Sequence, residues 1–204
     1  MYETFFGLAR SPFGISPDPH FLFLTAAHRE ALAGLVYAIV NRKGFVVLSG
    51  DAGTGKTTLL RAVVDSMPAN LAQFGLILNP ALTRAEFLEL AMLEFGMPEI
   101  PPNKAKRLVQ FREFLLRNHA EGKLAVLFVD EAHRLSANVL EEIRLLSNFE
   151  TVEGRLHQIV LAAQGALAWS AAVASERPIP MPTLARYRAL ARTSRLHQSR
   201  EKLG

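Results

Sequence analysis

One glycine-rich segment of the sequence has the residue types and the spacing of a phosphate-binding loop. Residues 50–57 read Gly-Asp-Ala-Gly-Thr-Gly-Lys-Thr, which matches the pattern G-x-x-x-x-G-K-[ST]. Glycines let the backbone curl until several N–H groups face one anion, and a helix that begins there adds the positive end of its dipole. Lys56 can reach the β- and γ-phosphates of a nucleotide, and the Thr57 hydroxyl can ligate Mg²⁺. The segment therefore predicts a P-loop whose binding residues are Gly50, Asp51, Ala52, Gly53, Thr54, Gly55, Lys56, Thr57 and Thr58.

Two adjacent carboxylates follow the apolar run of residues 124–129. Asp130 and Glu131 come directly after Leu-Ala-Val-Leu-Phe-Val, the arrangement known as a Walker B motif. Asp130 would hold Mg²⁺ through its water shell, together with Thr57, and Glu131 would orient and deprotonate an attacking water. Taken alone, such a pair is equally well explained as a solvated strand end. A P-loop in the same chain favours the catalytic interpretation, because ligands gather at the carboxyl ends of parallel strands.

Two further polar positions lie near these motifs in the sequence. Gln164 follows the apolar run 158–163, where it could touch a γ-phosphate as a sensor or simply end a strand, and the sequence leaves both interpretations open. Glu131, Lys56 and Gln164 are thus the catalytic candidates. Residues 130–133 spell Asp-Glu-Ala-His, a helicase-like string, but a helicase motor of that kind needs two such domains. His133 is therefore expected to be a surface or helix-start residue.

The remaining histidines of the body show no metal-ligand spacing, so we expect ordinary surface residues; they are His20, His28, His119 and His157.

Strand-like and helix-like segments alternate along the chain. Short apolar runs predict strands at 45–49, 73–78, 124–129 and 158–163. The first three are expected to be buried, and the strand 45–49 on both faces. Helical periodicity and capping residues predict helices at 25–43, 56–66, 84–96 and 104–120, with a further helix capped by Ser136. This alternation predicts an α/β fold in three layers, with a parallel sheet between helices.

Composition and charge restrict the class of protein. The chain has 204 residues, of which 50% are hydrophobic and 21% charged, and it has no cysteine, so disulfides and thiolate metal sites are excluded. No signal peptide or membrane-spanning run is recognisable, and we expect a cytoplasmic protein. The net charge is +4, but residues 165–204 alone carry +5 and residues 1–164 carry −1. Nucleic acid is therefore not an expected partner of the body.

The motifs, in their order, resemble those of a known family. The segments GFVVLSGDAGTGKTTLLR, VLFVDEAHRLS and QIVLAAQ, with the preceding SPFGISPDPHFLFL and HREALAGLVYAI, look like the AAA ATPases of the general secretion pathway protein A type. The resemblance covers about residues 1–164. It implies a P-loop fold with ATP and Mg²⁺, a homo-oligomer, and a partner in a bacterial secretion or envelope-assembly system. The expected divisions are an N-terminal arm and helix (1–43), a P-loop ATPase core (44–164) and a divergent basic tail (165–204).

The resemblance stops at Gln164. The family would continue with an arginine-bearing segment, a fifth strand beside the strand 45–49, and a helical lid, none of which matches residues 165–204. An out-of-frame end and a genuine tail that binds a partner are the two explanations left open. We therefore expect a core truncated before the fifth strand and lid, with the strand 45–49 left as an unpaired edge. Hydrolysis by this chain alone is expected to be very slow. Two other functions stay open, namely an ATP-binding scaffold without effective hydrolysis and a DNA-associated transposition ATPase.

Overall fold

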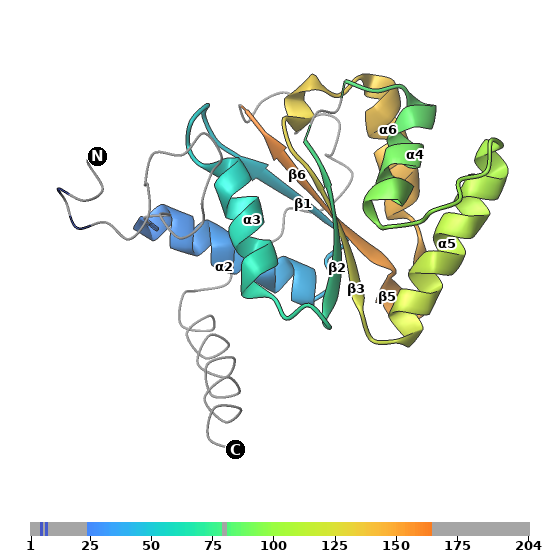
Figure 1. The fold of residues 1–204 in the computed structure, drawn as a ribbon, viewed down its shortest axis with the longest axis horizontal. Helices are drawn as coiled ribbons and strands as arrows, with labels where there is room; N and C mark the ends of the chain where they lie inside the picture. The colour runs from blue at the N-terminus through green and yellow to red at the C-terminus, as the bar shows by residue number, and fades with distance from the viewer. Residues whose placement is uncertain (1–4, 6, 8–23, 79–80, 165–204) are drawn as a thin grey trace, which may run out of the picture.

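A computed structural model describes residues 5, 7, 24–78 and 81–164 of the chain (Figure 1). Within these ranges, no helix is both long enough and apolar enough to cross a membrane. Most of the expected N-terminal arm and all of the expected tail, including any fifth strand or lid, lie outside the described residues. The apolar phenylalanines of the arm predict that it packs on the body, but Phe5, which the structure describes, is 82% exposed.

Four parallel strands form the central sheet, in the order β1-β6-β3-β2. Their bounds are Phe45–Ser49 for β1, Ala72–Ile77 for β2, Leu124–Val129 for β3 and His157–Ala163 for β6. Every residue of β3 and β6 is buried, as expected for the two central strands. Because all four strands run in the same direction, the loops after their carboxyl ends gather at one edge of the sheet.

Helices cover both faces of this sheet (Figure 1). α2 (Ala26–Val40) and α3 (Lys56–Ser66) lie on one face, and α4 (Arg84–Glu94), α5 (Lys104–Ala120) and α6 (Ala137–Ser147) lie on the other. The predicted three-layer α/β fold is confirmed.

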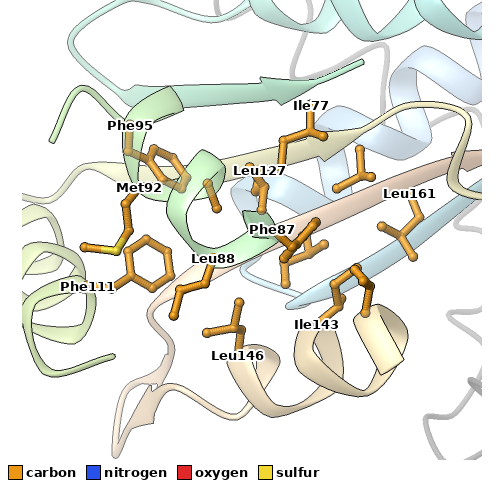
Figure 2. Close-up of a cluster of buried hydrophobic side chains, with 14 of the residues drawn as sticks. Ile77, Phe87, Leu88, Met92, Phe95, Phe111, Leu127, Ile143, Leu146 and Leu161 are labelled. Atoms are coloured by element: carbon orange, nitrogen blue, oxygen red, sulfur yellow. The ribbon is translucent and has the colours of Figure 1, made fainter. Parts of the chain in front are cut away.

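The core is divided between the two faces by the alternation of side chains along the strands. Val126 and Phe128 of β3 belong to the cluster under α2 and α3, whereas Leu127 and Val129 belong to the cluster under α4, α5 and α6. Figure 2 shows the second cluster, in which Phe87, Phe111 and Leu127 are fully buried. Burying one such side chain contributes about 1.5–3 kcal/mol, so the central strands are held firmly from both sides.

The predicted helix starts are confirmed by their caps. At the start of α4 the Thr83 hydroxyl accepts the Glu86 N–H, and the Glu86 carboxylate accepts the Thr83 N–H at 2.7 Å, which is the reciprocal capping box. Ser136 caps α6 by accepting the Val139 N–H. The helices 56–66 and 104–120 and the strand 124–129 have the predicted bounds.

The prediction that the strand 45–49 is buried on both faces is wrong, and the strand predicted at 73–78 is buried only in part. Among the described strands β1 has one neighbour, β6, and Val47 at its centre is 37% exposed. An unbroken apolar run indicates a strand but carries no information about its place in the sheet order. A two-stranded hairpin of β4 (Glu150–Thr151) and β5 (Gly154–Arg155) was not predicted, since strands of two residues have no hydrophobic pattern.

Candidate functional site

The loop between β1 and α3 has the curled backbone expected of residues 50–57. Gly53 and Gly55 have φ angles of 75° and 79°, in the left-handed region that glycine enters without steric cost. A Cβ atom at Gly50 would lie 2.9 Å from the Thr54 hydroxyl oxygen, so a side chain here would displace that hydroxyl from its hydrogen bond to the Asp51 carbonyl. The glycines of the motif are therefore required by the shape of the loop.

Lys56 is the first residue of α3 and is only 8% exposed. Its Nζ donates to the carbonyl oxygens of Gly50 at 3.0 Å and Asp51 at 2.8 Å, so the ammonium group lies against the loop that precedes it. α3 begins at this residue without a side-chain cap. The positive charge and the uncapped N–H groups of the helix start are thus concentrated in one place, which suits a phosphate group.

Thr57 and Asp130 come together although they are far apart in the sequence. The Thr57 hydroxyl donates to Asp130 Oδ2, and Asp130 Oδ1 accepts the Glu131 N–H at 2.8 Å. Asp130 follows β3 directly and is only 3% exposed, so its carboxylate is held in one orientation. A hydroxyl and a carboxylate oxygen are hard donors of the kind that Mg²⁺ prefers. The donor set at this position therefore fits a magnesium ion bound beside the phosphate loop.

Glu131 begins the short 3₁₀ helix η2 (Ala132–Arg134) with a φ of 49°, an uncommon value for a residue with a side chain. Its carboxylate is 37% exposed and lies 3.4 Å from Nε2 of His133. The Gln164 backbone N–H lies 3.4 Å from Nδ1 of the same ring. His133 thus lies in a helix start, as expected. It also lies between Glu131 and Gln164, two candidates that no sequence motif links.

Gln164 lies at the end of β6, between the P-loop that follows β1 and the carboxylates that follow β3. The sheet order therefore brings all three catalytic candidates to one edge. Whether the Gln164 side chain acts as a sensor stays a prediction, since its described contact is made by the backbone.

One contact of the loop was missed from the sequence. Nε2 of His28, in the first turn of α2, lies 2.9 Å from the Thr54 carbonyl oxygen. The available signal was local: Thr25 and His28 have the spacing of a capping box, which places His28 at the start of the helix before β1. Nothing in that spacing indicated that the helix start meets the P-loop.

Comparison with known proteins shows the family to which the chain belongs. Residues 40–168 match the family model described as AAA domain. The chain belongs to this family. The matched AAA domain includes the P-loop, both carboxylates and Gln164.

Among curated proteins, the chain is similar to General secretion pathway protein A of Aeromonas hydrophila. The two are 44% identical over 165 residues, which cover 80% of this chain and 30% of the relative. The resemblance to the general secretion pathway protein A type is confirmed, and the chain carries an AAA-type ATPase module related to that protein. It spans less than a third of the relative's length.

Solved structures show the same fold at low sequence identity. The Aeropyrum pernix ORC2 protein in its ADP form matches with a TM-score of 0.54 and 18% identity, covering 79% of this chain and 47% of that one. Cdc6p from Pyrobaculum aerophilum matches with a TM-score of 0.52 and 17% identity, covering 80% of this chain and 44% of that one. These matches support the three-layer α/β fold.

Proposed function

We propose that residues 44–164 form an ATPase core that binds ATP with Mg²⁺ at the carboxyl ends of β1, β6 and β3. The observation that carries the proposal is the contact between Thr57 and Asp130, because it brings the predicted metal donors of the P-loop and of the β3 end to one point. Membership in the AAA domain family supports nucleotide as the ligand. A solvated strand end would not require a buried Asp130 whose two oxygens both accept hydrogen bonds.

The residues of the site have separate roles in this proposal. The backbone of residues 50–58 and the Lys56 ammonium bind the phosphates, and Thr57 and Asp130 hold Mg²⁺, which when bound would neutralise charge on the phosphate oxygens. Glu131 accepts a proton from the attacking water. Gln164, which ends the strand between them, is the candidate sensor of the γ-phosphate.

The biological setting is proposed from the relative. Similarity to General secretion pathway protein A favours a bacterial secretion or envelope-assembly system, with a homo-oligomer as the working form. Phosphate release measured over a range of protein concentrations separates an ATPase from an ATP-binding scaffold. Turnover that rises more than linearly with concentration supports an oligomeric ATPase, and nucleotide binding without turnover favours the scaffold. DNA binding at physiological salt would favour a transposition ATPase.

The magnesium part of the proposal has a direct test. Affinity for a fluorescent ATP analogue is measured with Mg²⁺ and with EDTA, in the wild type and in Thr57→Val, Asp130→Ala and Ser66→Ala. Thr57→Val and Asp130→Ala should lose most of the gain in affinity that Mg²⁺ provides. Ser66→Ala removes a hydroxyl at the other end of α3, where it bonds to the Val63 carbonyl, and should keep that gain. A wild-type affinity that is the same in Mg²⁺ and in EDTA would contradict the assignment.

A further inference from the structure

The N-terminal turn of α2 lies directly against the P-loop. Thr25 caps this helix, and the His28 side chain returns to the Thr25 backbone N–H. On its other side, the His28 ring reaches the Thr54 carbonyl at 2.9 Å, across 26 residues of sequence. Leu35 of α2 and Leu60 of α3 belong to one core cluster, so the helix that carries His28 packs beside the helix that follows the P-loop.

The contacts of the ring decide which nitrogen carries the proton. Nδ1 faces the Thr25 backbone N–H at 3.4 Å and the Thr25 hydroxyl at 2.9 Å. A backbone N–H can only donate, so Nδ1 acts as the acceptor and the proton of the neutral ring is on Nε2. Nε2 therefore donates to the Thr54 carbonyl, which can only accept.

This hydrogen bond fixes the orientation of one peptide group in the loop. Because the peptide bond is planar and trans, the Thr54 carbonyl and the Gly55 N–H point in opposite directions. Because the hydrogen bond holds the Thr54 carbonyl toward His28, the Gly55 N–H points away from His28. The Thr54 hydroxyl donates to the Asp51 carbonyl at 2.9 Å and holds the same turn from within. Gly55 has no side chain to restrict its backbone, so this peptide needs an outside anchor.

We propose that His28 is a positioning residue for phosphate binding, which acts by anchoring the Thr54–Gly55 peptide of the P-loop. The inference rests on the proposed nucleotide site and adds a residue outside the P-loop motif to it. The alternative is a purely structural role, because His28 also completes the cap of α2. The two roles predict different effects on nucleotide affinity.

The experiment compares His28→Met and His28→Gln with Thr25→Ala. Methionine is similar in length to glutamine but has no N–H to donate, whereas glutamine can accept at Thr25 or donate at Thr54. Affinity for a fluorescent ATP analogue is measured with Mg²⁺, and folding is checked by circular dichroism. Loss of one hydrogen bond corresponds to roughly three- to tenfold in affinity, which is the loss expected in His28→Met. His28→Gln should lose less, and Thr25→Ala should lower the melting temperature while keeping affinity within about twofold of the wild type.

The possible results are distinguishable. If folded His28→Met binds the analogue as tightly as the wild type, the inference is overturned. If Thr25→Ala weakens binding as much as His28→Met, the histidine acts only as a helix cap, which also overturns it. If His28→Met does not fold, its affinity cannot be measured. The rate of amide hydrogen exchange in residues 50–57 is then compared between His28→Gln and Thr25→Ala. Faster exchange in Thr25→Ala than in His28→Gln would then overturn the inference. A wild type that does not bind the analogue would contradict the proposed function itself.

Discussion

The two ends of the central strands differ in the hydrogen bonding of their polar side chains. At the carboxyl end, the polar side chains of Lys56, Thr57 and Asp130 all have hydrogen-bond partners, and they lie beside the loop and helix start that can receive a ligand. At the amino end, His157 begins β6 and is 2% exposed, and within the described part of the chain neither of its ring nitrogens has a hydrogen-bond partner. Its ring instead packs against Phe111 and Phe149.

The carboxyl end of the sheet presents polar side chains to a possible ligand, whereas the polar side chains at the amino end are buried in the core. A buried, unpartnered imidazole costs free energy and offers no access to a ligand. Its neighbour Gln158 is also buried, and its side chain accepts the Gly44 N–H at 2.5 Å, joining β6 to the turn before β1. Substitutions at the carboxyl end should therefore change nucleotide affinity or turnover with little loss of stability. Substitutions at the amino end should lower the free energy of unfolding and leave nucleotide affinity and turnover unchanged.

The largest expected effect is at the carboxyl end. Glu131→Gln should lower turnover by about 10²–10⁴-fold, because the amide cannot accept the proton of the attacking water. Affinity for the ATP analogue should stay near the wild-type value. Phosphate release checks the first part, in protein concentrated enough for wild-type turnover to be measurable. Glu113→Gln, at an exposed position of α5, is the matched control. Wild-type turnover in Glu131→Gln would remove Glu131 as the base.

The next effect belongs to the amino end and depends on pH. Burial, with a smaller contribution from Arg155, lowers the pKa of His157 from 6.5 to about 4. The unfolded chain therefore takes up this proton first as the pH falls. Stability should be unaffected by this group above pH ~6.5 and should fall by about 3 kcal/mol as the pH approaches 4.

His157→Leu should flatten that part of the pH dependence, measured as the free energy of unfolding in urea at several pH values. Val160→Ala, a substitution in the same strand that removes no titratable group, should lower stability at every pH and leave that pH dependence in place. An unchanged slope in His157→Leu would show that other groups cause the acid sensitivity.

Lys56→Ala should weaken binding of the ATP analogue by more than tenfold, since it removes a charge-assisted contact to phosphate worth on the order of 1.5–3 kcal/mol. The melting temperature should change little by comparison. Lys106→Ala, an exposed lysine of α5, should bind as the wild type does. Equal affinity in the wild type and in Lys56→Ala would contradict the P-loop assignment.

The smallest effect compares two glycines at the amino end of the sheet. Gly44 and Gly122 have φ angles of 85° and 74°. A Cβ atom added at Gly44 would overlap the Arg155 side chain, whereas at Gly122 it would meet no described residue other than its chain neighbours within 4 Å. Both alanine variants should lose about 1 kcal/mol from backbone strain. Gly44→Ala should lose more, because Arg155 must move from its contact with the Ser147 carbonyl. Urea unfolding measures the difference, and equal losses would show that Arg155 moves freely. Nucleotide affinity should be unchanged in both.

Much of the fold was predictable because its signals are local. The bounds of α3, α5 and β3, the Thr83 and Ser136 caps and the curled loop of residues 50–57 all depend on residues within a few positions of one another. The P-loop and the Asp130–Glu131 pair were recognised in the same way, from residue types at fixed spacing.

The tertiary structure alone decided how these parts meet. The order β1-β6-β3-β2 puts Gln164 between the P-loop and the carboxylates and buries His157 in an aromatic cluster. The packing of α2 beside α3 brings His28 to Thr54. Capping and periodicity act within a turn or two of the chain, so the sequence alone determined the helices, the strands and the chemistry-bearing motifs. The strand order depends on which faces of the helices and strands bury apolar area against each other. These contacts join residues far apart in the chain, so no short stretch of sequence predicts them.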